Sequence, residues 1–296
     1  MKRSDQVTCV IPTIGRPELR RAVESVLKQR GGPPRVIVVL DRPEEREHVL
    51  SVVLADLTVD LMVTPGRVGG GRARNLGTLA CSTPYVAYLD DDDWWEPLKL
   101  DRQLSLVHRD AQTVDDRVVS ATAMSFIRPG QQPRSVPAVP YTEGTPIEDY
   151  LVTRSTLRYG RNAMQTSTLL VSRKLAIETL WRDDLPKHQD WDFIARLMRA
   201  DSVSFVWVPA ELTNVVQDSR DSVSKKPDWR TSSVWLESHW PNLGRRARSD
   251  FILTQVMRSA LSARDKDGLR YALQSLRHSG LPHWPAVIVA LSGILI

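Results

Sequence analysis

Four short apolar runs near the start of the chain alternate with segments whose apolar residues recur at helical spacing, and this alternation limits the fold more than any other feature. The runs cover residues 7–11, 35–40, 57–63 and 84–89. Strands joined by helix-length connections form right-handed crossovers and pair in parallel. Unbroken valine and isoleucine suit strands that are covered on both faces. We therefore predict an α/β fold with a mostly parallel sheet flanked by helices.

Polar or glycine residues directly follow each of these runs or lie in the turn after it. In an open parallel sheet, ligands bind outside the carboxyl ends of the strands. The residues at the four ends are Pro12 and Thr13, Asp41, Gly69 to Gly71, and Asp90 to Asp93. Their coincidence at one edge of the sheet predicts a binding site there.

Four consecutive aspartates, Asp90 to Asp93, stand between the fourth run and Trp94. Like charges at the mouth of a buried strand repel each other, and burial raises that cost. A Mg²⁺ or Mn²⁺ ion would relieve it, since such ions take hard oxygen ligands and complete their shell with water and phosphate. The alternative is a solvated acidic turn. The position at a strand end favours a metal-diphosphate site.

Two other segments carry candidate site residues. Arg72 and Arg74 follow the glycine turn at an expected helix start, where backbone N–H groups and guanidinium favour an anion or a nucleotide. A plain loop with surface arginines is the alternative. Asp190 and Asp192 lie at a later helix start. They are either helix-terminus charges or include a general base for an incoming hydroxyl.

Composition and motif searches exclude some classes and leave others open. The 296 residues carry a net charge of +5, which suits polyphosphate ligands, nucleic acid or an anionic membrane and does not choose among them. The P-loop, the dinucleotide-binding glycine pattern and the serine-hydrolase elbow are absent. The six histidines lack metal-ligand spacing.

The two cysteines and the chain ends bear on location. Cys9 and Cys81 lie in separate apolar segments, so we expect reduced core residues in a reducing compartment. We find no signal peptide and no apolar stretch long enough to span a membrane. A cytoplasmic location is therefore expected. The apolar segment 284–296 should pack against the body, with peripheral membrane contact or a homodimer contact as alternatives.

Five segments in consistent order carry a resemblance to a known family. They are Val10–Thr13, Asp41, Gly71–Gly77, Tyr88–Trp94 and Gln189–Asp192. Over roughly residues 6–225 the chain resembles family 2 glycosyltransferases, which have the Rossmann-like GT-A fold. Each segment alone is unspecific, whereas all five in order are specific.

The resemblance implies an inverting transfer of a sugar from a nucleoside diphosphate sugar, with UDP favoured, to a hydroxyl or amine acceptor. It also implies a role for individual residues. Pro12, Thr13 and Asp41 match nucleoside-binding positions, and Gly71 and Arg74 match the turn beside the base and ribose. Asp90 and Asp91 match the donor site, and Asp92 matches the ligand of Mg²⁺ or Mn²⁺. Asp190 matches the catalytic base. Asp91 and Asp93 are also expected to shape the turn.

The chain departs from the family pattern in ways that affect these roles. Gln189 replaces the glutamate that usually precedes the base, and the usual late-loop histidine is missing, so Arg220 is the candidate diphosphate contact in a lid over 217–229. The Gln-x-x-Arg-Trp motif of processive synthases is absent, which favours a single transfer. The candidate acceptor-side residues are Gln165, Ser167 and Trp191.

We expect three parts: by the resemblance, 1–115 binds the nucleotide sugar and 116–230 carries the acceptor side and the base, while the sequence pattern predicts that 231–296 is a helical extension. The acceptor is an unidentified glycan or small molecule, and no nucleic-acid partner is expected. One alternative is a sugar-nucleotidyltransferase. Such an enzyme is expected to have a basic phosphate loop, which Gly15–Arg16 matches only weakly. Another is a catalytically silent nucleotide-binding scaffold.

Overall fold

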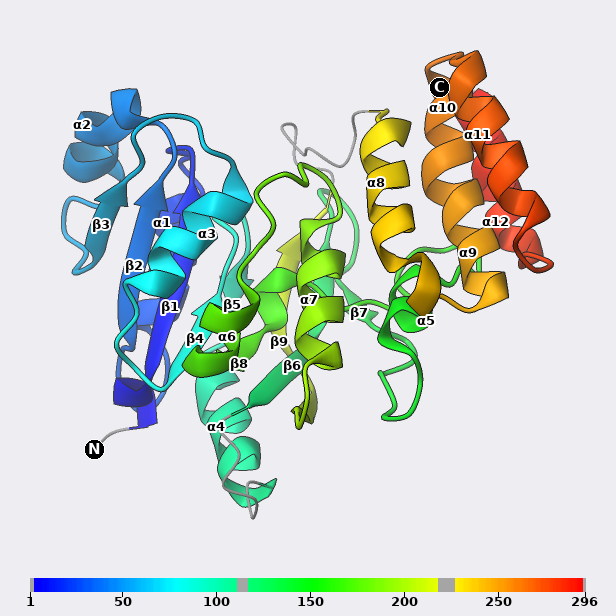
Figure 1. The fold of residues 1–296 in the computed structure, drawn as a ribbon. Helices are drawn as coiled ribbons and strands as arrows, with labels where there is room; N and C mark the ends of the chain where they lie inside the picture. Colours follow the sequence, from blue (N-terminus) through cyan, green and yellow to red (C-terminus); the bar gives the residue numbers. More distant parts are fainter. Residues whose placement is uncertain (1–2, 111–116, 218–226, 295–296) are drawn as a thin grey trace. The chain divides into compact units, whose positions relative to one another are not determined.

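The computed structural model describes residues 3–110, 117–217 and 227–294 (Figure 1). The chain divides into two compact units. The first unit comprises Met1–Val136, Met164–Asp183 and Arg196–Ser219, and the second comprises Pro137–Ala163, Asp184–Ala195 and Arg220–Ile296. All described strands belong to the first unit, and the second unit is mainly helical.

The described part of the first unit is built on one nine-stranded sheet in the order β3-β2-β1-β4-β8-β6-β9-β5, with β7 paired to β6 (Figure 1). The strands are β1 (Val7–Thr13), β2 (Arg35–Leu40), β3 (Asp60–Val63), β4 (Tyr85–Tyr88), β5 (Trp94–Trp95), β6 (Val118–Ile127), β7 (Arg134–Val136), β8 (Leu170–Ser172) and β9 (Ser204–Val216). Strands β3, β2, β1 and β4 are parallel neighbours, as are β6 and β9, while β8 runs antiparallel between β4 and β6. The predicted α/β fold is confirmed.

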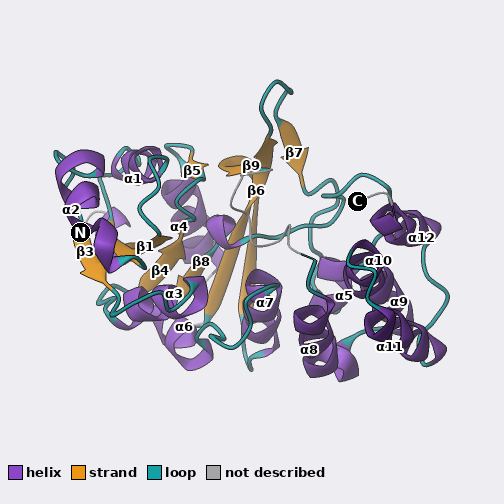
Figure 2. Ribbon diagram, turned by 90° about the horizontal axis from the view of Figure 1, so that it is seen from above, coloured by secondary structure: helices purple, strands orange, loops and turns teal. Residues whose placement is uncertain are grey.

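Helices cover both faces of the parallel strands (Figure 2). The helices of the first unit are α1 (Leu19–Leu27), α2 (Arg46–His48), α3 (Gly70–Leu79), α4 (Lys99–Asp110) and α6 (Arg173–Thr179). Cys9 and Ile11 of β1 pack into one core cluster with α1 and α4, whereas Val10 faces α3 on the other side. This two-residue alternation, apolar on both faces, explains the continuous apolar runs.

The second unit gathers the helices of the C-terminal part. They are α5 (Ile147–Val152), α8 (Trp229–His239), α9 (Arg245–Phe251), α10 (Arg258–Ser262), α11 (Lys266–Arg277) and α12 (Trp284–Leu291), while α7 (Gln189–Arg199) begins in this unit. The predicted helical extension is confirmed. No described helix has the length and hydropathy that a bilayer crossing requires.

Both cysteines are buried core residues without a disulfide, as the sequence predicts. Cys9 is fully buried, and burial raises the pKa of its thiol. A thiol in that state is an inert core group.

Close packing of α3 on the sheet requires a glycine at residue 77. A methyl group there would clash with Val10 and would approach Cγ2 of Val39 to 3.2 Å. We expect Gly77→Ala to lower the free energy of unfolding by about 1–3 kcal/mol, because the core has no room for the added carbon. Urea unfolding measures this. Gly66→Ala is the matched control, since its methyl group would meet nothing within 4 Å. Equal losses in both variants would contradict the packing argument.

A lysine is fully buried beneath the strand that follows the aspartates. Lys99 donates from Nζ to Oε1 of Gln103 at 2.8 Å, and its ammonium lies 4.2 Å from the ring centroid of Trp95. Burial lowers the pKa of Lys99 to about 7. The unfolded chain therefore holds this proton more tightly than the folded chain between pH 7 and the ordinary lysine pKa.

It follows that stability should rise as pH increases through 7. From pH 6.5 to 8.5 the free energy of unfolding should increase by about 2 kcal/mol from Lys99 alone. Lys99→Met should remove this increment and should not destabilise the protein at pH 6.5, where the wild-type chain buries a charge. Urea unfolding at the two pH values tests both statements. The same pH increment in the variant would show that Lys99 does not cause it.

Candidate active site

The four aspartates after β4 divide into a buried pair and a partly exposed pair. Asp91 and Asp93 are buried. The side chains of Asp90 and Asp92 are 36% and 17% exposed, compared with 9% for that of Asp91. Alternate residues of the turn thus face opposite ways, so that two carboxylates are presented outward.

The buried carboxylates hold the turn in place. Asp91 accepts a hydrogen bond from Oγ1 of Thr13 at 2.7 Å. Asp93 accepts from Oγ of Ser167 at 2.6 Å and from the backbone N–H of Val216 at 2.9 Å. Burial raises the pKa of Asp91 to about 6, and burial, followed by the charges of neighbouring aspartates, raises the pKa of Asp93 well above its usual range. These two residues therefore connect the ends of three strands.

The partly exposed carboxylates face arginines. Arg74 of α3 forms an ion pair with Asp90. Nη1 of Arg16 lies 3.3 Å from a carboxylate oxygen of Asp91 and 3.3 Å from one of Asp92. Arg21 donates to the backbone carbonyl of Asp92 at 2.6 Å. The guanidinium groups offset the repulsion that four adjacent carboxylates would otherwise suffer.

Arg74 is held in position from a second side. Its guanidinium lies 4.8 Å from the ring centroid of Trp181. The side chain of Asn75 donates to the carbonyl of Trp181 at 2.8 Å and accepts from its N–H at 2.7 Å. A segment a hundred residues away in sequence thus fixes the start of α3 beside the aspartate turn.

Asp41, at the end of β2, organises the loop that leads to α3. The residue is 7% exposed. Its carboxylate accepts from Oγ1 of Thr64 and from the N–H groups of Val68 and Gly69, each at 2.8 Å. Gly69 adopts φ 88°, a left-handed value that favours glycine. The predicted glycine turn therefore opens α3, with Gly71 buried in its first turn.

The candidate base lies in the second unit. Asp190 is in the first turn of α7, and Oδ1 accepts from the N–H of Trp191 at 3.0 Å. His188, just before the helix, has φ 63°, and its Nε2 lies 2.9 Å from Oγ of Ser232. Burial lowers the pKa of His188 well below its usual range, so its ring is neutral. A residue held at positive φ beside a candidate base indicates a local structure that is tightly constrained.

Aromatic and buried polar groups anchor this helix start. The His188 ring stacks on Trp191 with centroids 5.0 Å apart. Two residues after Asp190, Asp192 places Oδ1 3.1 Å from Nε2 of His239, and Glu148 lies 3.5 Å from Nδ1 of the same ring. All three members of that cluster are at most 2% exposed. The His239 ring of α8 therefore connects Asp192 of α7 to Glu148 of α5.

The remaining predicted site residues differ in how far they are buried. Pro12 and Thr13 are buried at the end of β1. Ser167 is 1% exposed, and its hydroxyl also accepts from the N–H of Asp90 at 3.1 Å, so it lies behind the aspartate turn. Gln165 is partly exposed. Arg220 and most of the predicted lid over 217–229 lie outside the described residues.

Comparisons with known proteins identify the family of the chain. The family model described as "Glycosyl transferase family 2" matches residues 8–171. The chain belongs to this family. Amylovoran biosynthesis glycosyltransferase AmsB of Erwinia amylovora is 30% identical over 218 residues, covering 71% of this chain and 69% of AmsB. Succinoglycan biosynthesis protein ExoO of Rhizobium meliloti is 36% identical over 84 residues, covering 28% of this chain and 24% of ExoO.

Solved structures show the same fold. S. aureus TarS has a TM-score of 0.61 at 14% identity, and the match covers 98% of this chain and 53% of TarS. This chain thus spans about half the length of that protein. TarS 1–349 in complex with UDP-GlcNAc has a TM-score of 0.59 at 13% identity, covering 92% of this chain and 81% of that one. The chain has the GT-A fold of family 2 glycosyltransferases.

The donor set of this glycosyltransferase fits a divalent cation with few protein ligands. Within the described ranges, no group of three His, Cys, Asp or Glu side chains is placed to hold a metal ion. Asp90 and Asp92 present two outward carboxylates. Mg²⁺ commonly uses one or two carboxylates and completes its shell with water and substrate phosphates. The pair fits an ion that arrives with a diphosphate.

Two arginines that contact the aspartate turn were not predicted as site residues: Arg16 was named only for the nucleotidyltransferase alternative, and Arg21 was not named. Arg16 follows β1, and Arg21 lies in α1, where its guanidinium is 4.0 Å from the ring centroid of Trp94. The available signal was the position of Arg16 after the first strand, at the same sheet edge as the aspartates. Within the first unit, Thr13, Arg74 and the aspartates converge as predicted.

Proposed function

We propose that the chain transfers one sugar from a nucleoside diphosphate sugar to a hydroxyl or amine acceptor, with inversion at the anomeric carbon. The observation that carries this proposal is the division of the aspartate turn. Two carboxylates support the turn from inside, and two face outward beside Arg16 and Arg74. That pattern of outward acids and adjacent cations suits a cation and a diphosphate together.

On the donor side, we assign the nucleoside to Pro12, Thr13 and Asp41. Gly71 and Arg74 flank the base and ribose, and Asp90 and Asp91 complete the donor contacts, with Asp91 acting through Thr13. UDP is the favoured nucleotide, which agrees with the UDP-GlcNAc complex of the structural relative TarS. Ser167 supports the turn, and Gln165 and Trp191 remain the acceptor-side candidates.

Asp90 and Asp92 would hold Mg²⁺ or Mn²⁺ against the diphosphate. When bound, the ion supplies positive charge that stabilises the leaving diphosphate. Arg16 and Arg74 carry out the same electrostatic task from the protein, because their guanidinium groups already lie against these carboxylates.

On the acceptor side, Asp190 takes the proton from the attacking hydroxyl. The oxygen then attacks the anomeric carbon from the face opposite the diphosphate, and no covalent enzyme intermediate forms. The carboxylate is fixed for this by the N–H of Trp191 at 3.0 Å and by the constrained turn at His188. A base must be held within hydrogen-bond reach of the proton that it removes.

A thermal-shift panel of nucleotides and nucleotide sugars tests the donor class. UDP and UDP-sugars with Mg²⁺ or Mn²⁺ should raise the melting temperature most, since a ligand at 100 times its Kd adds about 2.7 kcal/mol of apparent stability. A panel in which no nucleotide shifts the transition would contradict the proposal. Formation of a new diphosphate bond, rather than a glycosidic bond, would favour a sugar-nucleotidyltransferase. The cytoplasmic location stays a prediction.

A further inference from the structure

A pocket within the second unit is lined by four arginines, and the donor and base assignments leave it unused. Its volume is about 170 Å³. Arg154, Arg158 and Arg161 come from the segment after α5, and Arg258 begins α10. Among the residues that the structure describes, the lining of the pocket includes no aspartate or glutamate. Several cations without a carboxylate among them favour an anionic occupant.

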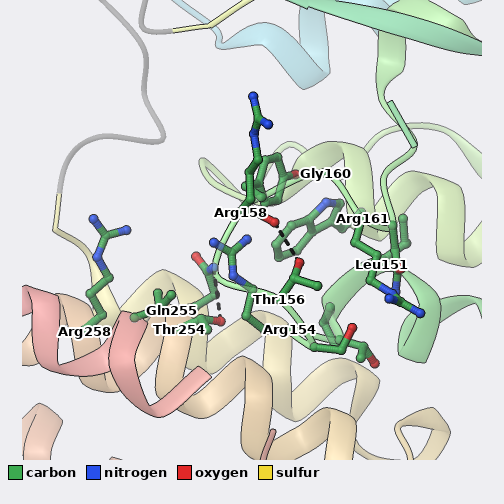
Figure 3. A pocket seen from close by; sticks show the side chains of 16 residues that line it. Leu151, Arg154, Thr156, Arg158, Gly160, Arg161, Thr254, Gln255 and Arg258 are labelled. Carbon is green, nitrogen blue, oxygen red and sulfur yellow. Dashed lines mark hydrogen bonds between the residues drawn. The ribbon is translucent and has the colours of Figure 1, made fainter. Parts of the chain in front are cut away.

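Three of the four arginines extend in a common direction. Figure 3 shows the side chains of Arg154, Arg158 and Arg258 extending toward the same side of the pocket, while Arg161 turns away from them. Arg158 and Arg258 are exposed, and Arg154 is partly buried. Planar guanidinium forks match the oxygens of a phosphate and bind it through paired hydrogen bonds.

Buried contacts fix the pocket wall. Asp250 is fully buried, and its Oδ2 accepts from the N–H of Arg154 at 2.8 Å and lies 2.7 Å from Nδ1 of His283. Oγ1 of Thr156 donates to the carbonyl of Arg158 at 2.9 Å. The backbone that carries two of the arginines is thus held in place before any ligand binds.

One lining residue of the pocket directly follows the proposed base in the sequence. Trp191 lines the pocket, and the N–H of the same residue donates to Asp190 at 3.0 Å. Burial lowers the pKa of Lys187; the charge of Asp228 raises it, and the charge of Arg258 lowers it by less.

We propose that this pocket binds a phosphate group carried by the sugar acceptor and so positions the acceptor hydroxyl at Asp190. The inference rests on the proposed function, because it takes Asp190 as the base. It adds the chemical class of the acceptor: an anion whose phosphate lies apart from the donor diphosphate. Uncharged acceptors of the same shape would lack the contacts with Arg154, Arg158 and Arg258.

The phosphate has two possible sources, a water-soluble sugar phosphate or a lipid headgroup. Val289 of α12 lines the pocket, and the same helix exposes apolar side chains. Trp284, Ile288 and Leu291 are 65%, 46% and 53% exposed. Because both sources present the same phosphate chemistry to the arginines, the experiment has one arm for each.

In the first arm, the chain is saturated with UDP and Mg²⁺ to fill the donor side, and glycerol 1-phosphate is titrated by calorimetry. The double variant Arg158→Ala with Arg258→Ala should raise the Kd of the probe about tenfold or more. The control pairs Arg270→Ala with Arg277→Ala, which removes the same charge from α11. It should leave the Kd unchanged, and glycerol should not bind.

In the second arm, vesicles of phosphatidylcholine with and without phosphatidic acid are sedimented with each protein. A lipid-borne phosphate predicts that phosphatidic acid retains the wild-type and control chains and not the Arg158/Arg258 variant. If the phosphate belongs to a soluble sugar phosphate, the double variant should bind more weakly than the wild type in the titration with glycerol 1-phosphate only. If the double variant matches the control with both probes, the inference is overturned. The affinity of the wild-type chain for UDP is measured in the same experiment. If UDP does not bind, the proposed function is overturned instead.

Discussion

Asp190→Asn is expected to reduce the rate of sugar transfer by about 10²–10⁴-fold, the usual contribution of a general base. The amide keeps the shape of the carboxylate and cannot take the acceptor proton. Oδ1 can still accept from the N–H of Trp191, so the start of α7 should keep its structure. The Kd for UDP should stay within twofold of the wild-type value. Steady-state rates and calorimetry measure the two quantities.

Asp201→Asn serves as the control for this prediction. Asp201 is exposed and follows α7. Its substitution removes the same charge as Asp190→Asn, but at a position outside the proposed site. The control should transfer sugar at the wild-type rate. Wild-type turnover in Asp190→Asn would remove Asp190 from the mechanism, whereas a parallel loss in both variants would indicate a general effect of charge.

Asp92→Asn is expected to weaken UDP binding in the presence of Mn²⁺ by about tenfold or more, which corresponds to 1.4 kcal/mol. The outward carboxylate is one of two that would hold the ion, and an amide is a weaker ligand for a hard cation. Without Mn²⁺, the affinity of the variant should match or exceed that of the wild type, because one repulsive charge facing the diphosphate has been removed. Calorimetric titrations with and without the ion separate these cases.

A suitable control for Asp92 is Asp60→Asn, at the exposed start of β3. Asp60 pairs with Arg35 at 2.7 Å on the surface, away from the aspartate turn. Its UDP affinity should respond to Mn²⁺ as the wild type does. If Asp92→Asn keeps the full Mn²⁺ dependence, the metal role of the outward carboxylates is wrong.

Local sequence patterns predicted most of the parallel half of the sheet, although the third run, 57–63, forms a strand only over Asp60–Val63. The apolar runs predicted β1 and β2 closely, because strands covered on both faces are continuously apolar. The glycine turn predicted the start of α3. The position of the aspartates at the end of β4 then predicted the edge at which the donor residues gather.

Other elements depend on contacts that no local pattern reveals. The run 203–208 predicts a strand that stops before Pro209, yet β9 continues to Val216. Its pairing with β6 shifts between Val208 and Glu211, so the proline lies in a bulge where a missing N–H is tolerated. Strand β5 has only two residues and exists because it pairs with Thr213 and Asn214. The three-part division of the chain stays a prediction.

The geometry of the site likewise depends on distant partners. Thr13, Ser167 and Val216 decide which aspartates turn inward, and they are 78, 74 and 123 residues away from them in sequence. The arginine pocket joins the segment after α5 to α10, about a hundred residues later. The sequence shows the residue types in both cases, and only the fold shows which of them meet.

The products formed from the donor alone give the most direct test of the central claim. The chain is incubated with an α-linked UDP-sugar and Mn²⁺ without acceptor, so that water replaces it, and the products are followed by proton NMR. Inverting transfer predicts UDP together with a free sugar that first appears in the β configuration. Release of sugar 1-phosphate, or first appearance of the α sugar, would contradict it.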